Sequence, residues 1–280
     1  MTRYAFKQVD VFTPVPYLGN PVAVVLDAAG VDEATMRRFT DWTNLSEATF
    51  VLPPVHPEAD YRLRIFCPGR ELPFAGHPTL GSCHAWLEAG GRPKRGDVIV
   101  QECAAGLVPI RREDGRLAFQ APPRLRSGPL DDADADRIVR GLGLQLADVV
   151  AHAWCDNGPP WQAVLLRSAA QVLTLQPDRR ALDGSFVGVV APHARGGECD
   201  FEVRAFFPGQ AGLIEDPVTG SLNAALGQWL VEAGHAPSRY VAAQGTALGR
   251  AGRVHVARDD AGGTWVGGAS ATCIDGRVTL

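Results

Sequence analysis

Three side chains that can transfer protons, Glu47, His77 and Asp216, stand in or beside short loops rich in glycine, proline and small polar residues. Glu47 lies where a polar stretch gives way to the apolar run 48–52. Burial there would raise its pKa toward neutrality, which suits a group that takes up and releases a proton. A glutamate at a strand end that points into water is the alternative. The residue types indicate acid/base chemistry centred on Glu47.

Asp216 and Ser221 belong to segment 215–221 (Glu-Asp-Pro-Val-Thr-Gly-Ser), which we expect to open a helix. The first N–H groups of a helix have no partner within it, so this segment could bind an anion such as a carboxylate. N-capping is the alternative role for both side chains. Segment 76–82 (Gly-His-Pro-Thr-Leu-Gly-Ser) offers the same geometry around His77. Its imidazole could exchange a proton near neutral pH, with a structural histidine as the alternative.

These two loops look like copies of one unit. Residues 66–69 (Phe-Cys-Pro-Gly) precede the first loop, and residues 206–209 (Phe-Phe-Pro-Gly) precede the second. The Gly-Ser pairs at 81–82 and 220–221 are 220 − 81 = 139 residues apart, and this offset also pairs the histidine of one loop with the aspartate of the other. A helix pattern ending in Ala-Gly follows each pair, and we expect the second helix to be about one turn longer. The repeat predicts two similar halves with a cleft between them.

The remaining pattern favours an α+β fold. Short apolar runs separated by Gly and Pro predict many strands. Helical patterns are fewer, and they fall at about 32–44, 79–89, 132–141 and 219–233. We expect an N-terminal half at 1–118, joined by a C-terminal strand at about 268–280, and a C-terminal half at 119–267. The active site is expected in the cleft between the halves.

The composition is that of an ordinary globular protein, with 46% hydrophobic and 21% charged residues among 280. A net charge of −4 gives no broad positive field, so nucleic acid is not an expected partner. No apolar run approaches the roughly 18 residues of a membrane span, so we expect a cytoplasmic protein with no membrane partner. The six cysteines are scattered, which predicts reduced thiols and no metal site.

Three segments in order, 44–50 (Asn-Leu-Ser-Glu-Ala-Thr-Phe), 74–81 (Phe-Ala-Gly-His-Pro-Thr-Leu-Gly) and 215–221, resemble the PhzF family of phenazine-biosynthesis-like isomerases. Residues 10–13 and 19–21 near the start resemble it too. The resemblance implies a diaminopimelate-epimerase-like fold, in which two similar halves each curl a sheet around a central helix. It also implies proton-shift chemistry without metal or organic cofactor, and a homodimer is compatible with it.

By the same resemblance, Glu47 is the acid/base residue, while His77 and Asp216 hold the substrate and assist proton movement. The implied substrate-binding residues are Asn20, Ser46, Gly76, Gly220 and Ser221. The expected activity is an isomerase that shifts a proton within a small substrate bearing a carboxylate. The physiological substrate is not fixed by the family, because one fold serves many substrates.

Two other functions are compatible with the sequence. An epimerase or racemase would need a second base opposite Glu47, for which the sequence offers His77 or Asp216. Epimerases of this fold use two cysteines, and the corresponding positions here are expected to be Ala75 and Asp216, which disfavours racemisation by two thiols. A catalytically silent small-molecule-binding protein of the same fold is the second alternative.

Overall fold

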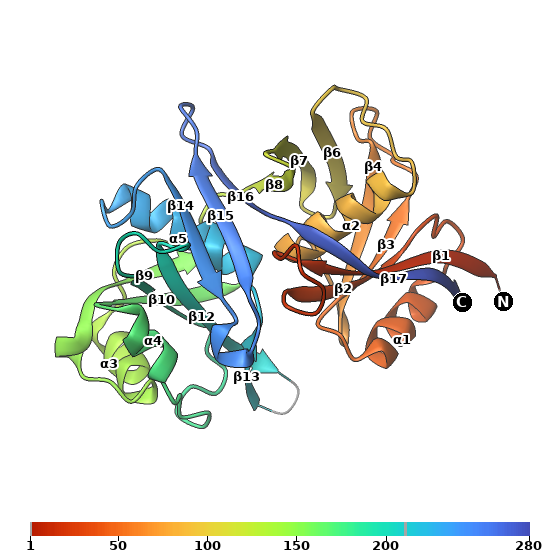
Figure 1. Ribbon diagram of the computed structural model, residues 1–280. Helices are drawn as coiled ribbons and strands as arrows, with labels where there is room; N and C mark the ends of the chain where they lie inside the picture. Colours follow the sequence, from red (N-terminus) through yellow and green to blue (C-terminus); the bar gives the residue numbers. More distant parts are fainter. Residues whose placement is uncertain (1, 210–211) are drawn as a thin grey trace. The chain divides into compact units, whose positions relative to one another are not determined.

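The computed structural model describes residues 2–209 and 212–280 of the chain, which divides into two compact units (Figure 1). The first unit comprises Met1–Gln120 and Gly267–Leu280, and the second comprises Ala121–Val266. Within the described ranges, no helix has both the length and the apolar character needed to cross a membrane.

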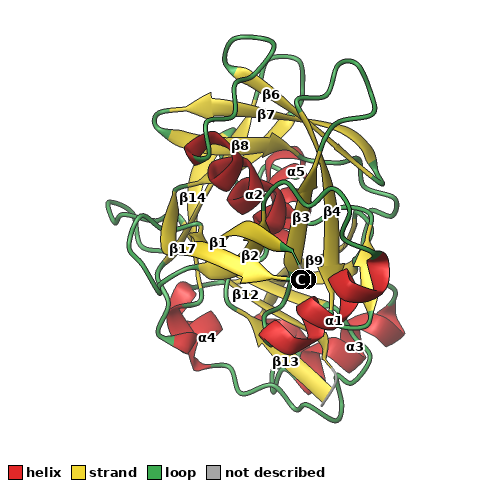
Figure 2. Cartoon of the chain, turned by 90° about the vertical axis from the view of Figure 1, so that its right-hand side faces the viewer, coloured by secondary structure: helices red, strands yellow, loops and turns green. Residues whose placement is uncertain are grey.

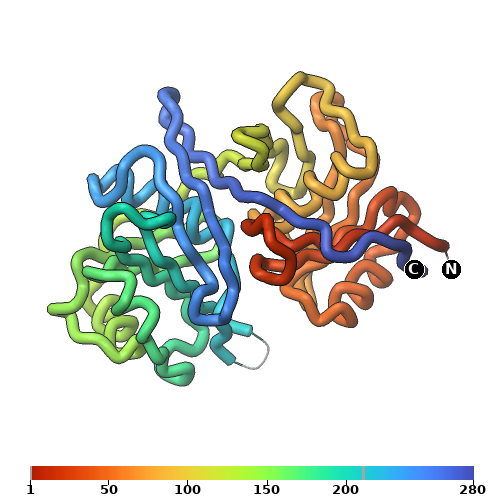
Figure 3. Tube along the Cα trace, in the orientation of Figure 1, coloured from red at the N-terminus to blue at the C-terminus, as the bar shows by residue number. Residues whose placement is uncertain are grey.

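The first unit is a mixed sheet with two helices, α1 (Glu33–Thr43) and α2 (Gly76–Glu88). Its strands are β1 (Arg3–Val11), β2 (Asn20–Val25), β3 (Ala48–Leu52), β4 (Tyr61–Cys67), β5 (Arg70–Leu72), β6 (Val98–Cys103), β7 (Gly106–Glu113), β8 (Arg116–Gln120) and β17 (Ser270–Thr279). Strands β2 and β3 pair in parallel, as do β4 and β6, whereas β3–β4, β4–β5 and β6–β7 are antiparallel. The C-terminal strand β17 runs antiparallel beside β1, so both chain ends lie in this unit (Figure 3).

Helix α2 lies among the strands of the first unit and packs against β1, β2, β3, β4, β6, β8 and β17 (Figure 2). Nine of its 13 residues are buried, so it lacks the single apolar stripe of a surface helix. Gly81 allows the helix to approach the sheet closely, because a Cβ at this position would lie 2.4 Å from Cγ1 of Val22 in β2.

Helix α1 covers the opposite face of the same strands. Its N-terminus is capped by Asp32, whose carboxylate accepts a hydrogen bond from the Thr35 amide. Its buried face includes Met36 and Phe39, which pack in one core cluster with residues of β2, β3 and β4. The helix ends at Asn44 in the left-handed conformation, φ 56°, and three further residues lead into β3.

The second unit is a mixed sheet with α3 (Asp132–Gly141), α4 (Ala169–Thr174) and α5 (Gly220–Glu232), and the 3-10 turns η1 (Leu146–Asp148) and η2 (Thr246–Leu248). Its strands are β9 (Val149–Asp156), β10 (Pro160–Leu166), β11 (Val187–Pro192), β12 (Phe201–Gly209), β13 (Gly212–Asp216), β14 (Arg239–Gln244) and β15 (Gly252–Arg258). Strand β16 (Thr264–Gly268) crosses the boundary between the units along the chain. Helix α5 has nine buried residues of 13, like α2.

The strand connections of the first unit recur in the second. The order β2-β3-β4-β5-α2-β6-β7 reappears as β10-β11-β12-β13-α5-β14-β15. The pairings match as well: β10–β11 and β12–β14 are parallel, and β11–β12, β12–β13 and β14–β15 are antiparallel. The predicted internal repeat and the α+β class are therefore confirmed.

An ion pair is repeated at the same place in both units. Arg64 on β4 binds Glu71 on β5 through Nε and Nη2, and Arg204 on β12 binds Glu215 on β13 through the same two nitrogens. Each guanidinium also lies 5.0 Å from the centroid of a phenylalanine ring, Phe66 or Phe206. The two arginines are 204 − 64 = 140 residues apart in the sequence, and the two glutamates are 215 − 71 = 144 residues apart.

The predicted offset of 139 is wrong for the central helices. Helix α2 begins at Gly76 and α5 at Gly220, an offset of 144, and both have 13 residues, so the second is not longer. The Gly-Ser pair at 81–82 lies in the second turn of α2, whereas the pair at 220–221 starts α5. The offset grows from 140 to 144 because the β12–β13 hairpin contains four more residues than β4–β5.

This register changes the residue correspondence. The second residue of each helix is His77 in α2 and Ser221 in α5, so His77 does not correspond to Asp216 as expected. Asp216 ends β13 and corresponds to Leu72, which ends β5. The N-cap positions of the two helices are Ala75 and Thr219, so the expected equivalence of Ala75 with Asp216 is also wrong.

Candidate active site

Glu47 and His77 meet in the first unit. Glu47 directly precedes β3, and its carbonyl accepts a hydrogen bond from the Ala23 amide on β2, so the β2–β3 pairing fixes its backbone. His77 lies one helical turn before Gly81, on the face of α2 that packs against β2. Nε2 of His77 lies 3.2 Å from Oε2 of Glu47, and the two side chains are only 7% and 16% exposed.

The imidazole of His77 is held in its neutral form. Burial lowers the pKa of His77 to about 3, and a hydrogen bond to the backbone of Pro21 opposes this shift only partly. Proline has no backbone N–H, so the imidazole donates this bond to the Pro21 carbonyl. The donor is Nδ1, because Nε2 makes no hydrogen bond and instead faces Glu47. A neutral ring that carries its proton on Nδ1 turns a lone pair toward the Glu47 carboxyl.

The connection between β1 and β2 shapes the surroundings of this pair. A buried hydrogen bond from the Gly19 amide to Oδ2 of Asp10, 2.9 Å long, closes the connection immediately before Asn20. Phe12 is fully buried with a φ of 68°, a conformation that bulky residues rarely adopt. Asn20 begins β2 and is 1% exposed. It directly precedes Pro21, so this predicted binding residue adjoins the histidine's hydrogen-bond partner.

Two other predicted binding residues of this unit, Ser46 and Gly76, adjoin Glu47 and His77 along the chain. Ser46 is half-buried and directly precedes Glu47, and Gly76 is buried as the first residue of α2. Cys67, at the end of β4, was not predicted to belong to this site. Burial, together with the neighbouring charge of Glu47, raises the pKa of the Cys67 thiol. This thiol is therefore in its protonated form near neutral pH.

The predicted residues of the second unit gather at the start of α5. Asp216 is buried, and its Oδ2 accepts a 2.6 Å hydrogen bond from the hydroxyl of Thr219. Gly220 is the buried first residue of α5. Ser221 accepts a hydrogen bond from the indole N–H of Trp161 at 3.0 Å, and its backbone carbonyl accepts another from Asn157.

Neither central helix has a side-chain cap at its N-terminus. Ala75 has no side-chain oxygen, and the Thr219 hydroxyl makes no capping bond to α5. The N-cap position of α5 is Thr219, so neither Asp216 nor Ser221 occupies the N-cap position considered for them from the sequence. Sequence reasoning also missed Thr219, Asn223 and Gln244 as a group. The available signal was Asn223, a polar residue in an otherwise apolar stretch of helix.

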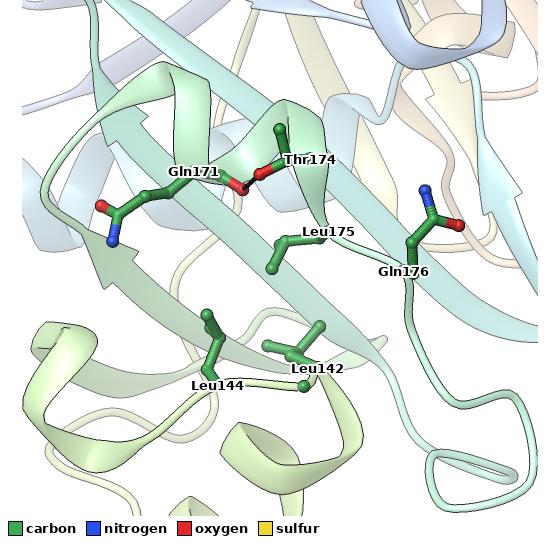
Figure 4. Close-up of a pocket in the computed structure, with 7 residues that line it drawn as sticks. Leu142, Leu144, Gln171, Thr174, Leu175 and Gln176 are labelled. Atoms are coloured by element: carbon green, nitrogen blue, oxygen red, sulfur yellow. Dashed lines mark hydrogen bonds between the residues drawn. The ribbon is translucent and has the colours of Figure 1, made fainter.

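A pocket of about 290 Å³ lies elsewhere in the second unit (Figure 4). Leu142 and Leu144, which follow α3, and Leu175, which follows α4, form its apolar wall. The Thr174 hydroxyl donates a hydrogen bond to the Gln171 carbonyl on its rim. None of the predicted site residues lines this pocket.

Residues 9–276 match the family described as phenazine biosynthesis-like protein, PhzC-PhzF. The fission yeast protein antisense-enhancing sequence 1 is 36% identical, with 99% of both chains covered. A Pseudomonas aeruginosa protein named trans-2,3-dihydro-3-hydroxyanthranilate isomerase is 33% identical over the full length of both chains. The crystal structure of a Bacillus anthracis phenazine biosynthesis protein of the PhzF family superimposes with a TM-score of 0.84, at 23% identity and full coverage of both chains.

The fold is thus of the diaminopimelate-epimerase type, as expected, and its class of activity is that of an isomerase. The chain belongs to the PhzF family of phenazine biosynthesis-like proteins.

Proposed function

We propose that this isomerase shifts a proton within a small substrate that bears a carboxylate, with Glu47 as the general acid/base and without a metal or organic cofactor. The observation that carries the proposal is the 3.2 Å contact between Glu47 and the buried, neutral His77. His77 and Asp216 are proposed to hold the substrate and assist the proton transfer. Asn20, Ser46, Gly76, Gly220 and Ser221 are proposed to bind it.

The Glu47–His77 contact favours a pair that holds one mobile proton. With its own proton directed to Pro21, His77 presents a lone pair at Nε2. An ionised Glu47 would present a second lone pair 3.2 Å away, and two acceptors at that distance repel. A proton between them relieves the repulsion, and when substrate binding moves that proton onto Nε2 of His77, Glu47 is able to act as the base. The same carboxyl then returns the proton to another carbon, so the reaction consumes no proton overall.

The carboxylate of the proposed substrate would be bound by backbone N–H groups. The first amides of α2 and α5 follow N-cap residues that supply no side-chain cap, which leaves the helix starts suited to an anion. Ser221 adds a hydroxyl, and because its oxygen accepts from Trp161, its own proton is directed elsewhere and can be donated.

Racemisation by two thiols is not favoured. The residues directly before the two central helices are Ala75 and Thr219, neither of which carries a thiol. The Cys67 thiol is protonated near neutral pH and adjoins the proposed base, not the opposite side of a substrate. One-base isomerisation therefore fits these residues better than two-base epimerisation.

The test uses trans-2,3-dihydro-3-hydroxyanthranilate, the compound in the name of the P. aeruginosa relative, together with a panel of small unsaturated carboxylic acids. Each compound is incubated with the protein in deuterium oxide, and the product is analysed by mass spectrometry and NMR. We expect enzyme-dependent isomerisation with deuterium gained at one carbon. We also expect it to survive exhaustive dialysis against a chelator.

Isomerisation or exchange that is lost on dialysis and restored by a metal ion or a flavin would contradict the cofactor-free mechanism. Binding of a compound without any exchange, across the whole panel, would support a catalytically silent binding protein instead. Inversion of a stereocentre without movement of a double bond would support an epimerase.

A further inference from the structure

A buried polar network surrounds the start of α5 in the second unit. Thr219 and Asn223 lie one turn apart on the helix, and Gln244 ends the neighbouring strand β14. Oε1 of Gln244 accepts from the Thr219 amide at 3.0 Å and from Nδ2 of Asn223 at 2.8 Å. Nε2 of Gln244 lies 2.9 Å from the Thr219 hydroxyl and 3.2 Å from the backbone carbonyl of Asp216. Asn223, Gln244 and Thr219 are all at most 6% exposed.

The partners in this network fix the direction of every hydrogen bond. A backbone amide can only donate and a backbone carbonyl can only accept, so the side-chain amide of Gln244 has one orientation. Its NH2 group then donates to the hydroxyl oxygen of Thr219. A hydroxyl has one proton, and that proton is left to point at Oδ2 of Asp216, 2.6 Å away. The network therefore makes Oδ2 an acceptor, which favours the ionised carboxylate.

The first unit contains a similar glutamine contact to its central helix, without the bond to a carboxylate. Gln101 on β6 donates to the Thr79 hydroxyl on α2, at the position of Asn223, and accepts from the Tyr61 hydroxyl. The positions of Thr219 and Asp216 are occupied there by Ala75 and Leu72. In both units a glutamine of the strand after the helix thus bonds the fourth helix residue, although Gln101 lies at the position of Ala242, two residues before that of Gln244. The hydroxyl and the carboxylate are present only in the second unit. The fold does not require them.

We propose that Thr219, oriented by Gln244, is a positioning residue that keeps Asp216 ionised and fixes the direction of its carboxylate. The proposal rests on the proposed function, in which Asp216 acts on the substrate. Thr219 acts through Asp216 and need not touch the substrate itself. A threonine at an N-cap position usually accepts a hydrogen bond from a helix amide through its hydroxyl. The Thr219 hydroxyl makes no such bond and donates to Asp216 instead.

Other charged groups on the elements around Asp216 also bear on its ionisation. Glu215 precedes it on β13 and is paired with Arg204 of β12, so its charge is largely balanced within that pair. Arg250 follows η2, and its Cβ lies 2.8 Å from where a Cβ of Gly245 would be, directly after β14. Neither group is altered by changing the Thr219 hydroxyl, so a variant at Thr219 isolates the network.

The first measurement needs no substrate. The protein is labelled with 13C at aspartate side-chain carboxyls, the Asp216 signal is assigned from its loss in Asp216→Asn, and its pKa is read from an NMR pH titration. Thr219→Val keeps the side-chain shape and removes the donor, and we expect the pKa of Asp216 to rise by about one pH unit. Thr219→Ser should restore the wild-type value. Thr79→Val, the same change on α2 in the first unit, should leave the Asp216 titration unchanged.

A titration of Asp216 that is the same in Thr219→Val and wild type would overturn the proposal, as would a shift that Thr219→Ser fails to restore. If Thr219→Val does not fold, as judged by amide spectra, Thr219→Ala tests the same donor with a smaller side chain. With the substrate identified above, Thr219→Val should lower kcat about tenfold or more with little change in KM, and Thr219→Ser should recover it.

The activity assay also distinguishes the proposed role of Asp216 in the reaction from the proposed positioning role of Thr219. Full activity in Asp216→Asn would remove Asp216 from the proposed function, whatever the titration shows. Loss of activity in Asp216→Asn together with wild-type activity in Thr219→Val would keep the proposed role of Asp216 and overturn the positioning role of Thr219.

Discussion

The two units share their strand order and central helix but differ in the residues around the start of that helix. Where the first unit has Glu47 before β3, the corresponding position before β11 is Phe186, whose ring packs edge to face on Trp161 at 5.4 Å. Where the first unit has His77, the second has Ser221. The Glu47–His77 contact is therefore a feature of one unit only, added to a framework that both units possess.

The Arg–Glu pair shows the opposite behaviour, since it is present in both units. Arg64 with Glu71 and Arg204 with Glu215 each tie a hairpin next to the central helix. An ion pair that recurs in both units is expected to stabilise the fold. A pair of residues that occurs in one unit only is a better candidate for catalysis. Variants that test this difference change a residue together with its counterpart or with a matched control.

The largest effect is expected for Arg204→Met. Arg204 is 7% exposed, and its Nη1 also donates to the carbonyls of Val172 and Leu175. Its loss leaves a buried carboxylate and two carbonyls without this partner, which should lower the free energy of unfolding by about 3–5 kcal/mol. Arg64→Met should cost about 1 kcal/mol, because Arg64 is 23% exposed and water can replace the guanidinium. Urea denaturation followed by circular dichroism measures both, and equal losses would show that burial does not distinguish the pairs.

An intermediate effect is expected where a glycine of α2 has an alanine as its counterpart in α5. Gly81→Ala would place a Cβ 2.4 Å from Cγ1 of Val22, and the overpacking should cost about 1–3 kcal/mol. It should also displace His77, one turn earlier on α2, and so lower turnover. The counterpart in the second unit is Ala225, and Ala225→Gly should cost about 1 kcal/mol through helix propensity without affecting turnover. Thermal unfolding and the isomerisation assay compare the two; a Gly81→Ala protein of wild-type stability would contradict the packing argument.

An effect that builds up gradually with acidity concerns the pH dependence of stability. The pKa of His77 is lowered from 6.5 to about 3 by burial, so folded His77 stays neutral while the unfolded chain takes up a proton below pH 6.5. The free energy of unfolding should therefore fall with decreasing pH between about 6.5 and 3, by at most about 1.4 kcal/mol per pH unit from this group. His77→Asn should flatten this slope, and His56→Asn, at an exposed histidine, should not. Identical slopes in wild type and His77→Asn would exclude the buried neutral histidine.

The sequence predicted the family and the α+β fold with its internal repeat. It also drew attention to Glu47 and His77, which the structure brings to 3.2 Å from each other, because both lie in short segments of distinctive residue types. It failed on the register of the repeat. Matching of Gly-Ser pairs ignored that Pro78 is tolerated in the first turn of a helix, so α2 could begin at Gly76. A helix buried on all sides has no apolar stripe from which its start can be read.

The network around Thr219 was beyond the reach of sequence reasoning for a different reason. Gln244 is 244 − 219 = 25 residues from Thr219, and only the parallel pairing of β12 with β14 and the packing of α5 bring them together. The four extra residues of the β12–β13 hairpin hid the correspondence of Asp216 with Leu72 in the same way. Insertions in hairpins shift the sequence offset without changing the strand pairing.

The central claim, that Glu47 moves the proton, is tested most directly by the rate at which substrate hydrogen exchanges with deuterium from the solvent. Glu47→Gln preserves size and removes the ionisable group, and Glu88→Gln, at the far end of α2 from His77, is the control. We predict that Glu47→Gln binds substrate with a Kd close to that of wild type and exchanges at least about 100-fold more slowly, whereas Glu88→Gln exchanges at the wild-type rate. Exchange by Glu47→Gln at near-wild-type rate would contradict the account and assign the base to another residue.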